Sequence, residues 1–208
     1  IIIFLIRKKI NSLIIYLIIF VTYGDNMHIQ YLKIVKDNAK QIAIFHKKVF
    51  NDILSYQDVK SLEKYYIKLI ENCFISQKAI YENRIVGYLI FSNENPFGTL
   101  IKASYFKFIY KSLKYFLSNK KEILFLVPTF LYSKKYKHFT ELSYIAVDGG
   151  LQRSDLKIGT NLINNLYKKM KSEEIWLKTN NTNAIDFYKK NGFTLEKYIY
   201  GRWYFILS

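Results

Sequence analysis

The sequence of 208 residues predicts one domain of the α/β (α+β) class over residues 27–208, on the basis of three segments. Residues 28–92 alternate between strand and helix periodicity and end in a β-hairpin. Residues 141–170 have the pattern of a strand, a polar loop and an amphipathic helix. Residues 181–193 have the pattern of a short helix with a polar start and a glycine stop. Strands and helices in this order are typical of a sheet that is covered by helices.

The first segment begins with a strand and two helices. The expected elements are a strand over residues 28–35, helices over 37–50 and 58–72, and hairpin strands over 77–81 and 85–92. Gly87 lies inside the second hairpin strand, where it permits the close approach of another backbone. His46 lies on the first helix, and we expect a packed or surface side chain there rather than a catalytic base.

An aromatic segment follows the hairpin and precedes the second segment. Its residues 100–118 predict a helix, and Pro128 interrupts a second apolar stretch at 123–131. The helix carries more aromatic side chains than one face can hold, which a buried helix explains. The alternative is an insertion that covers a substrate site, because small-ligand pockets have aromatic and apolar walls.

The strand, loop and helix of residues 141–170 have a geometry that suits a phosphate group. In the strand, Leu142, Tyr144 and Ala146 occupy one face and alternate with Ser143, Ile145 and Val147. Gly159 and Thr160 stand at the start of the helix, where unpaired N–H groups and the helix dipole favour a pyrophosphate. A plain strand-to-helix connection, which needs no ligand, is the alternative.

The segment from Asn181 to Phe193 predicts a short helix that presents one phenol. The Asn181 side chain can accept a hydrogen bond from a first-turn amide, and Gly192 ends the helix. One side of the helix carries Ala184, Phe187 and Tyr188. An ordinary capped surface helix has the same pattern.

Together the two segments resemble the GNAT superfamily of acyl-CoA-dependent N-acyltransferases. The family pattern Asn-x-x-Ala-x-x-Phe/Leu-Tyr with a closing Gly-Phe is matched at Asn181, Ala184, Phe187, Tyr188, Gly192 and Phe193. The family's phosphate pattern, Gln/Arg-x-x-Gly-x-Gly/Ala, is matched in part. Counted from Val147 it starts at Gln152, but Gly159 comes two residues late and a lysine, Lys157, replaces the first glycine. Counted back from Gly159 it starts at Ser154, so either the loop is longer or other amides hold the cofactor.

The resemblance implies a GNAT fold: a central mixed, mostly antiparallel splayed sheet, flanking helices and a helical insertion before the central strand. It also implies an N-acetyltransferase that transfers an acetyl group from acetyl-CoA, its co-substrate, to a primary amine. The insertion resembles those of members in bacterial surface-sugar pathways, so an amino sugar is the expected small amine, with a protein N-terminus or a lysine as other acceptors. The competing expectation is a non-catalytic GNAT-like binding protein, attached to a membrane or associated with nucleic acid.

The resemblance assigns roles to individual residues. The residues that would hold the cofactor are Ile145, Ala146, Val147, Gln152, Arg153, Lys157, Ile158, Gly159, Thr160, Asn181 and Tyr188. One strand amide, that of Ile145 or Ala146, would polarise the thioester carbonyl. Tyr188 would protonate the departing thiolate, and Glu141 would take the amine proton directly or through water. A core tyrosine and a solvated carboxylate are the alternatives for these two side chains.

The composition of the chain limits which kinds of ligand and partner are expected. The chain has 32 Lys and Arg against 16 Asp and Glu, a net charge of +16, but its lysines are scattered as in the product of an AT-rich genome. We therefore expect this positive charge to attract the phosphates of coenzyme A, and we expect no specific binding of nucleic acid. A single cysteine, Cys73, indicates a reducing, cytoplasmic location. The histidines lack ligand spacing, so no metal is expected. The oligomeric state stays open, a homodimer included.

The first 26 residues form an apolar extension whose role is separate from that of the domain. Residues 1–6 and 10–23 are nearly continuous apolar runs around a short basic stretch at 7–9. The second run is short for a bilayer span, which needs about 20 residues. An anchor, which would make the protein membrane-associated, is one interpretation. Translated upstream sequence that is not native is the other, because Met27 precedes a clean first strand.

Overall fold

The computed structural model of the chain describes residues 28–92, 110, 114–115, 117–118, 139–152, 155–168, 170, 174–199 and 201–207. The N-terminal extension of residues 1–26, the candidate cofactor residue Arg153 and most of the segment at 96–137 lie outside the described residues. Five residues of the predicted helix at 100–118 are described, and all five are helical. Within the described ranges, no helix has both the length and the apolar character that crossing a membrane requires.

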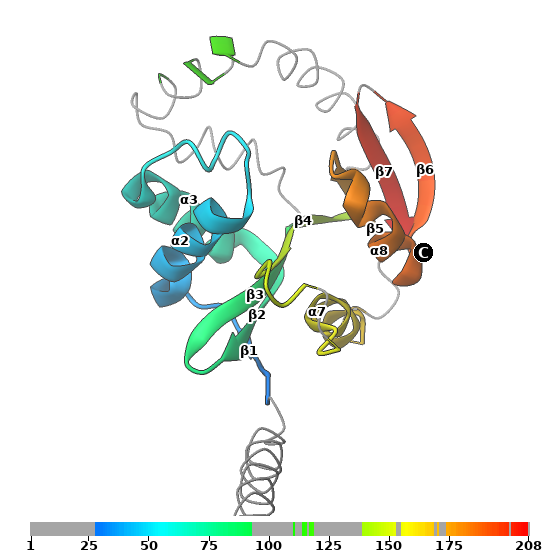
Figure 1. Cartoon of the computed structure of the whole chain (residues 1–208), viewed down its shortest axis with the longest axis horizontal. Coiled ribbons are helices and arrows are strands. Elements are labelled where there is room, and N and C mark those ends of the chain that lie inside the picture. Colours follow the sequence, from blue (N-terminus) through cyan, green and yellow to red (C-terminus); the bar gives the residue numbers. More distant parts are fainter. Residues whose placement is uncertain are drawn as a thin grey trace, which may run out of the picture.

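A seven-stranded mixed sheet forms the centre of the described fold (Figure 1). In spatial order, its strands are β1 (Gln30–Lys33), β2 (Cys73–Tyr81), β3 (Arg84–Ser92), β4 (Thr140–Val147), β5 (Ile175–Thr179), β7 (Arg202–Leu207) and β6 (Thr194–Ile199). Neighbouring strands are antiparallel except for β4 and β5, which are parallel. The prediction of a mixed, mostly antiparallel sheet flanked by helices is therefore confirmed.

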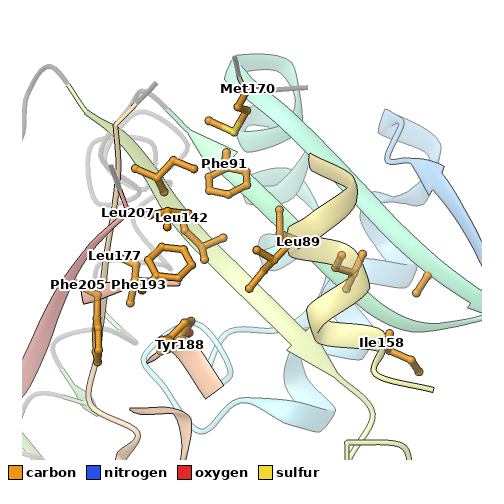
Figure 2. Packing of buried hydrophobic residues seen from close by; sticks show 14 of the residues in the cluster. Leu89, Phe91, Leu142, Ile158, Met170, Leu177, Tyr188, Phe193, Phe205 and Leu207 are labelled. Atoms are coloured by element: carbon orange, nitrogen blue, oxygen red, sulfur yellow. The ribbon is translucent and has the colours of Figure 1, made fainter. Parts of the chain in front are cut away.

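Helices cover both faces of this sheet (Figure 1). The described helices are η1 (Lys36–Asn38), α2 (Ala39–Val49), α3 (Val59–Asn72), α7 (Ile158–Tyr167), η2 (Thr182–Ala184) and α8 (Ile185–Lys190). Leu89 and Ile90 are neighbours on β3 and therefore point to opposite faces. Ile90 packs in one core with Ile42 of α2, whereas Leu89 packs in another with Leu162 of α7 and Tyr188 of α8 (Figure 2).

The β2–β3 hairpin turns at two residues in the left-handed conformation. Glu82 and Asn83 have φ angles of 48° and 60°, as the central residues of a type I′ turn require. β2 begins at Cys73, four residues before the expected start, because its first residues pair with the end of β3. At Gly87, a Cβ would lie 3.0 Å from the carbonyl oxygen of Ala146, so the predicted close approach of two backbones is confirmed.

A bulge interrupts β4 near its start. Ile90 of β3 pairs with Tyr144, and the next residue of β3, Phe91, pairs with Leu142. Ser143 is therefore the extra residue of a β-bulge. The bulge turns Leu142 into the core beneath α7, whereas Tyr144 packs against the core beneath α2 and α3. The prediction that Leu142 and Tyr144 share a face is wrong for this reason.

Candidate functional site

Strands β4 and β5 separate soon after they meet (Figure 1). Only two residue pairs join them: Thr140 with Ile175 and Glu141 with Trp176. Beyond these pairs, β4 runs on to Val147, while β5 pairs with β7 along its whole length. The expected splay of the central sheet is thus present, and its apex is the Glu141–Trp176 pair.

The main chain of β4 presents unpaired groups to this splay. The Asp148 N–H donates to the Val86 carbonyl of β3 at 2.8 Å, which sets the direction of the residues before it. Because N–H groups of alternate residues point to the same side of a strand, Ala146 also bonds to β3. The N–H groups of Ile145 and Val147 therefore face the splay. Of the two amides expected to polarise a thioester, only that of Ile145 has this direction.

The loop after β4 leads to the N-terminus of α7. The Gln152 side-chain amide donates to the Val147 carbonyl at 3.1 Å and ties the loop to the end of β4. Lys157 has a φ angle of 46°, a left-handed conformation that glycine adopts with less strain. Its carbonyl accepts the first helical bond, from the Asn161 N–H at 2.9 Å. The first-turn N–H groups with no carbonyl partner in the helix belong to Ile158, Gly159 and Thr160.

Gly159 brings the two sequence motifs together. A Cβ on Gly159 would lie 3.0 Å from Cζ of Phe187 on α8 and 3.6 Å from Cγ2 of Val147. The start of α7, the ring from α8 and the end of β4 therefore meet at one point. The phosphate-type loop and the Asn181 to Phe193 segment, which are separate in sequence, are neighbours in space.

Asn181 caps the segment that carries Tyr188, as predicted. Its side-chain oxygen accepts a hydrogen bond from the Asn183 N–H at 3.0 Å. The capped turn is the 3-10 helix η2, which continues into α8. Gly192 follows α8 with a φ angle of 87°, which explains why the helix stops there. A contact between Asn181 and the cofactor stays a prediction.

Tyr188 is a buried side chain with an unused hydroxyl. The residue is 8% exposed, and its ring packs on Phe193 and Phe205 at centroid distances of 5.8 and 5.5 Å (Figure 2). None of the described residues forms a hydrogen bond with the Tyr188 hydroxyl. Burial raises the pKa of Tyr188, so the phenol stays protonated at neutral pH.

Glu141 is a buried, paired carboxylate rather than a solvated one. It is 5% exposed, and its Oε1 accepts from Nζ of Lys178 at 2.9 Å. The same Nζ lies 4.9 Å from the centroid of the Trp176 ring. Sequence analysis overlooked Lys178, although a lysine inside the apolar stretch IWLKT is a signal for a buried partner.

A comparison with known protein families identifies the family of this chain. Residues 46–193 match the Acetyltransferase (GNAT) family, a range that covers more than half of the chain. The chain belongs to this family. The acetyltransferase therefore takes its acyl group from acyl-CoA and passes it to an amine, with acetyl-CoA as co-substrate.

Solved structures with the same fold are acetyltransferases too. PaiA N-acetyltransferase from Thermoplasma acidophilum, solved with coenzyme A, is 13% identical with a TM-score of 0.55, over 88% of this chain and 99% of that one. Naa50 from Arabidopsis thaliana, solved with a bisubstrate analogue, is 19% identical with a TM-score of 0.50, over 86% and 96%. An agmatine N-acetyltransferase mutant in its apo form is 12% identical with a TM-score of 0.56, over 86% and 98%. No curated protein matches the sequence.

The acetyltransferase has a hydrogen-bonded cluster on the other face of β4. His46 is fully buried, with Nε2 at 3.0 Å from Oδ1 of Asp52 and Nδ1 at 2.6 Å from the Tyr66 hydroxyl. The Tyr66 hydroxyl lies 2.7 Å from that of Tyr88, and the Tyr144 hydroxyl lies 2.9 Å from that of Tyr65. Of the two environments expected for His46, packed or on the surface, the structure shows the packed one. Within the described ranges, no group of three or more His, Cys, Asp or Glu side chains could hold a metal.

Proposed function

We propose that the acetyltransferase acetylates a small primary amine and binds acetyl-CoA in the splay between β4 and β5. The observation that carries this proposal is the loss of the β5 partner after Glu141, which leaves the N–H groups of Ile145 and Val147 without a strand to bind. An extended pantetheine arm carries amides that can replace that strand. The start of α7, next to Val147, supplies donors for the pyrophosphate at the end of the same strand.

The phosphate end of the site differs from the family pattern in the length of its loop and in the residue at the first glycine position. Lys157 takes the place of the first glycine and keeps the backbone conformation that a glycine would have, with a φ angle of 46°. It adds an ammonium group next to the free N–H groups of Ile158, Gly159 and Thr160. Gln152 and Arg153 precede this turn, and we assign both to the phosphate side of the site. We infer that the longer loop holds the pyrophosphate through the α7 amides and this extra charge.

The reacting end of the site lies between the Ile145 amide, Tyr188 and Glu141. The Ile145 N–H would stabilise the developing oxyanion of the thioester carbonyl. The Tyr188 hydroxyl, which has no other partner among the described residues, would protonate the departing thiolate. Glu141 would take the amine proton, through water where the amine does not reach it.

The acceptor that we propose is an amino sugar, with a protein N-terminus or a lysine as other candidates. The aromatic composition of the segment before β4 supports a small acceptor, because small-ligand pockets have aromatic and apolar walls. Of its described residues, Tyr115 is buried and packs on Tyr56 at a centroid distance of 4.7 Å. Tyr56 belongs to the connection between α2 and α3, so Tyr115 lies next to that connection. We place the enzyme in the cytoplasm, where acetyl-CoA and a reduced Cys73 are expected.

Calorimetric titration of the full chain with acetyl-CoA tests the cofactor site. We expect saturable binding, and a folded chain that does not bind at millimolar concentration contradicts the proposal. A panel of amino sugars, peptides and simple amines, assayed by thiol release, then tests the acceptor. Turnover with peptides and none with amino sugars would replace the proposed acceptor but not the reaction.

A further inference from the structure

Lys178 is a partly buried amine that the proposed reaction does not use. Its side chain is 15% exposed, and that of its partner Glu141 is 7% exposed. The ammonium donates to Oε1 of Glu141 at 2.9 Å and lies over the Trp176 ring. Lysine side chains are mostly exposed, and an ion pair that is largely removed from water is weak evidence for a role in stability. The position of the Glu141–Lys178 pair in the sheet suggests a role in the reaction instead.

The pair lies at the apex of the splay. Glu141 is the last residue of β4 with a partner on β5, and Trp176 is that partner. Paired residues share a face of the sheet, and so do residues two apart on one strand, so Lys178 lies on the face of Glu141. Lys178 is two residues beyond the last pair and therefore borders the part of β4 that has no partner on β5. The Ile145 N–H, which we propose as the donor to the thioester carbonyl, also lies on that part of β4.

We propose that Lys178 is a self-acetylation site, which receives an acetyl group from acetyl-CoA bound by the same chain. This inference rests on the proposed function, because it uses the same bound co-substrate. The Lys178 ammonium already contacts the carboxylate that we assign as the base for an external amine. The chain's own amine thus occupies the place on Glu141 that an acceptor amine would take.

The reaction balances without any further reactant. Glu141 takes a proton from the ammonium, and the neutral Nζ attacks the thioester carbonyl carbon. The C–S bond breaks, and the thiolate receives a proton from the Tyr188 hydroxyl, which is then reprotonated from the reacting nitrogen or from solvent. Of the two protons that the ammonium loses, one ends on the coenzyme A thiol and the other is released. The products are Nε-acetyllysine and coenzyme A.

Burial makes this transfer distinguishable from chemical acetylation in solution. Three other ion-paired lysines have exposed side chains: Lys36 at 62%, Lys48 at 63% and Lys68 at 53%. Free acetyl-CoA or acetyl phosphate would react first with exposed amines. A donor that is bound in the splay would react first with Lys178 because it is held close to that amine.

The test uses the full chain, acetyl-CoA with a deuterated acetyl group and peptide mass spectrometry. We expect label at Lys178 to appear about tenfold or more faster than at Lys36, Lys48 or Lys68, because proximity favours the bound donor. The rate per molecule should not depend on protein concentration. Glu141→Gln should slow labelling of Lys178 and leave labelling of Lys48 unchanged. Deuterated acetyl phosphate, which lacks the nucleotide, should show no preference for Lys178.

Two results separate the inference from the function on which it rests. If calorimetry shows that acetyl-CoA binds but Lys178 is labelled no faster than the exposed lysines, self-acetylation is overturned and the proposed function stands. If acetyl-CoA does not bind the folded chain, both are overturned. A labelling rate that rises with protein concentration shows transfer between molecules and also overturns the proposal.

Discussion

The ring of Phe187 lies directly against Gly159, at distances of 3.0 and 3.1 Å from the point where a Cβ would be. The φ angle of Gly159 is not positive, unlike those of Gly192 and Gly201. Glycine is therefore needed at this position for close packing and not for a special backbone conformation. The position of α8, and with it that of Tyr188, therefore depends on a missing side chain at the start of α7.

Gly159→Ala should weaken acetyl-CoA binding and destabilise the fold by about 1 kcal/mol, because the methyl group displaces the Phe187 ring from the first turn of α7. Gly149→Ala is the matched control, since a Cβ there would meet nothing within 4 Å. Chemical denaturation and calorimetry measure the two effects. Equal stability and affinity in both variants would show that the contact with Phe187 has no such role.

Lys157→Gly should stabilise the fold and weaken cofactor binding at the same time. The left-handed backbone conformation costs about 1 kcal/mol for a residue with a Cβ, and glycine removes this cost. Loss of one ammonium next to the pyrophosphate should raise the Kd for acetyl-CoA about two- to fivefold. Asn83→Gly, at a φ angle of 60° in the hairpin turn, should also stabilise the protein but leave the Kd unchanged. If Lys157→Gly binds acetyl-CoA as tightly as the parent, this lysine is not a phosphate ligand.

Tyr188→Phe should lower kcat about 10²-fold or more if the phenol is the general acid. The melting temperature should change little, because the hydroxyl has no hydrogen-bond partner among the described residues to lose. Tyr198→Phe, on β6 and 56% exposed, is the control for the substitution itself. Unchanged turnover in Tyr188→Phe, measured by thiol release, rules out the proton donor proposed here.

Asp52→Asn should make stability less dependent on pH on the acid side. Burial opposes ionisation of Asp52, but its hydrogen bond to His46, the His46 charge and the Ser55 and Leu54 amides outweigh burial and lower its pKa. A lowered folded pKa contributes stability above the ordinary value of about 4, and this contribution is lost as pH falls through the lower value. Melting temperatures of Asp52→Asn should fall less between about pH 5 and 2 than those of the parent and of exposed Asp155→Asn. Parallel curves for all three proteins would contradict the assignment.

Local patterns predicted the parts of the site that local rules govern. The cap at Asn181, the stop at Gly192 and the amphipathic helix that begins at Ile158 all depend on neighbours within a few residues. Contacts between distant segments were not predicted, because they do not depend on neighbours within a few residues. The Glu141–Lys178 pair joins residues 37 apart in sequence, and the bulge at Ser143 is defined only by pairing with β3.

The last three strands show the same limit. Pattern alone assigns no bounds to β5, β6 and β7, because their residues pair with one another and with β4 rather than following a local rule. β6 is an outer strand with mostly exposed side chains, so hydrophobic alternation gives it little signal. The family resemblance supplied the splayed sheet that these strands complete.

The side of β4 that loses its β5 partner has a practical consequence for handling the protein. A strand with free donors and acceptors is a template on which foreign chains can add, and here that template lies in the interior of a sheet. Preparations without coenzyme A should therefore aggregate on storage. Coenzyme A in every purification buffer should keep the enzyme monodisperse.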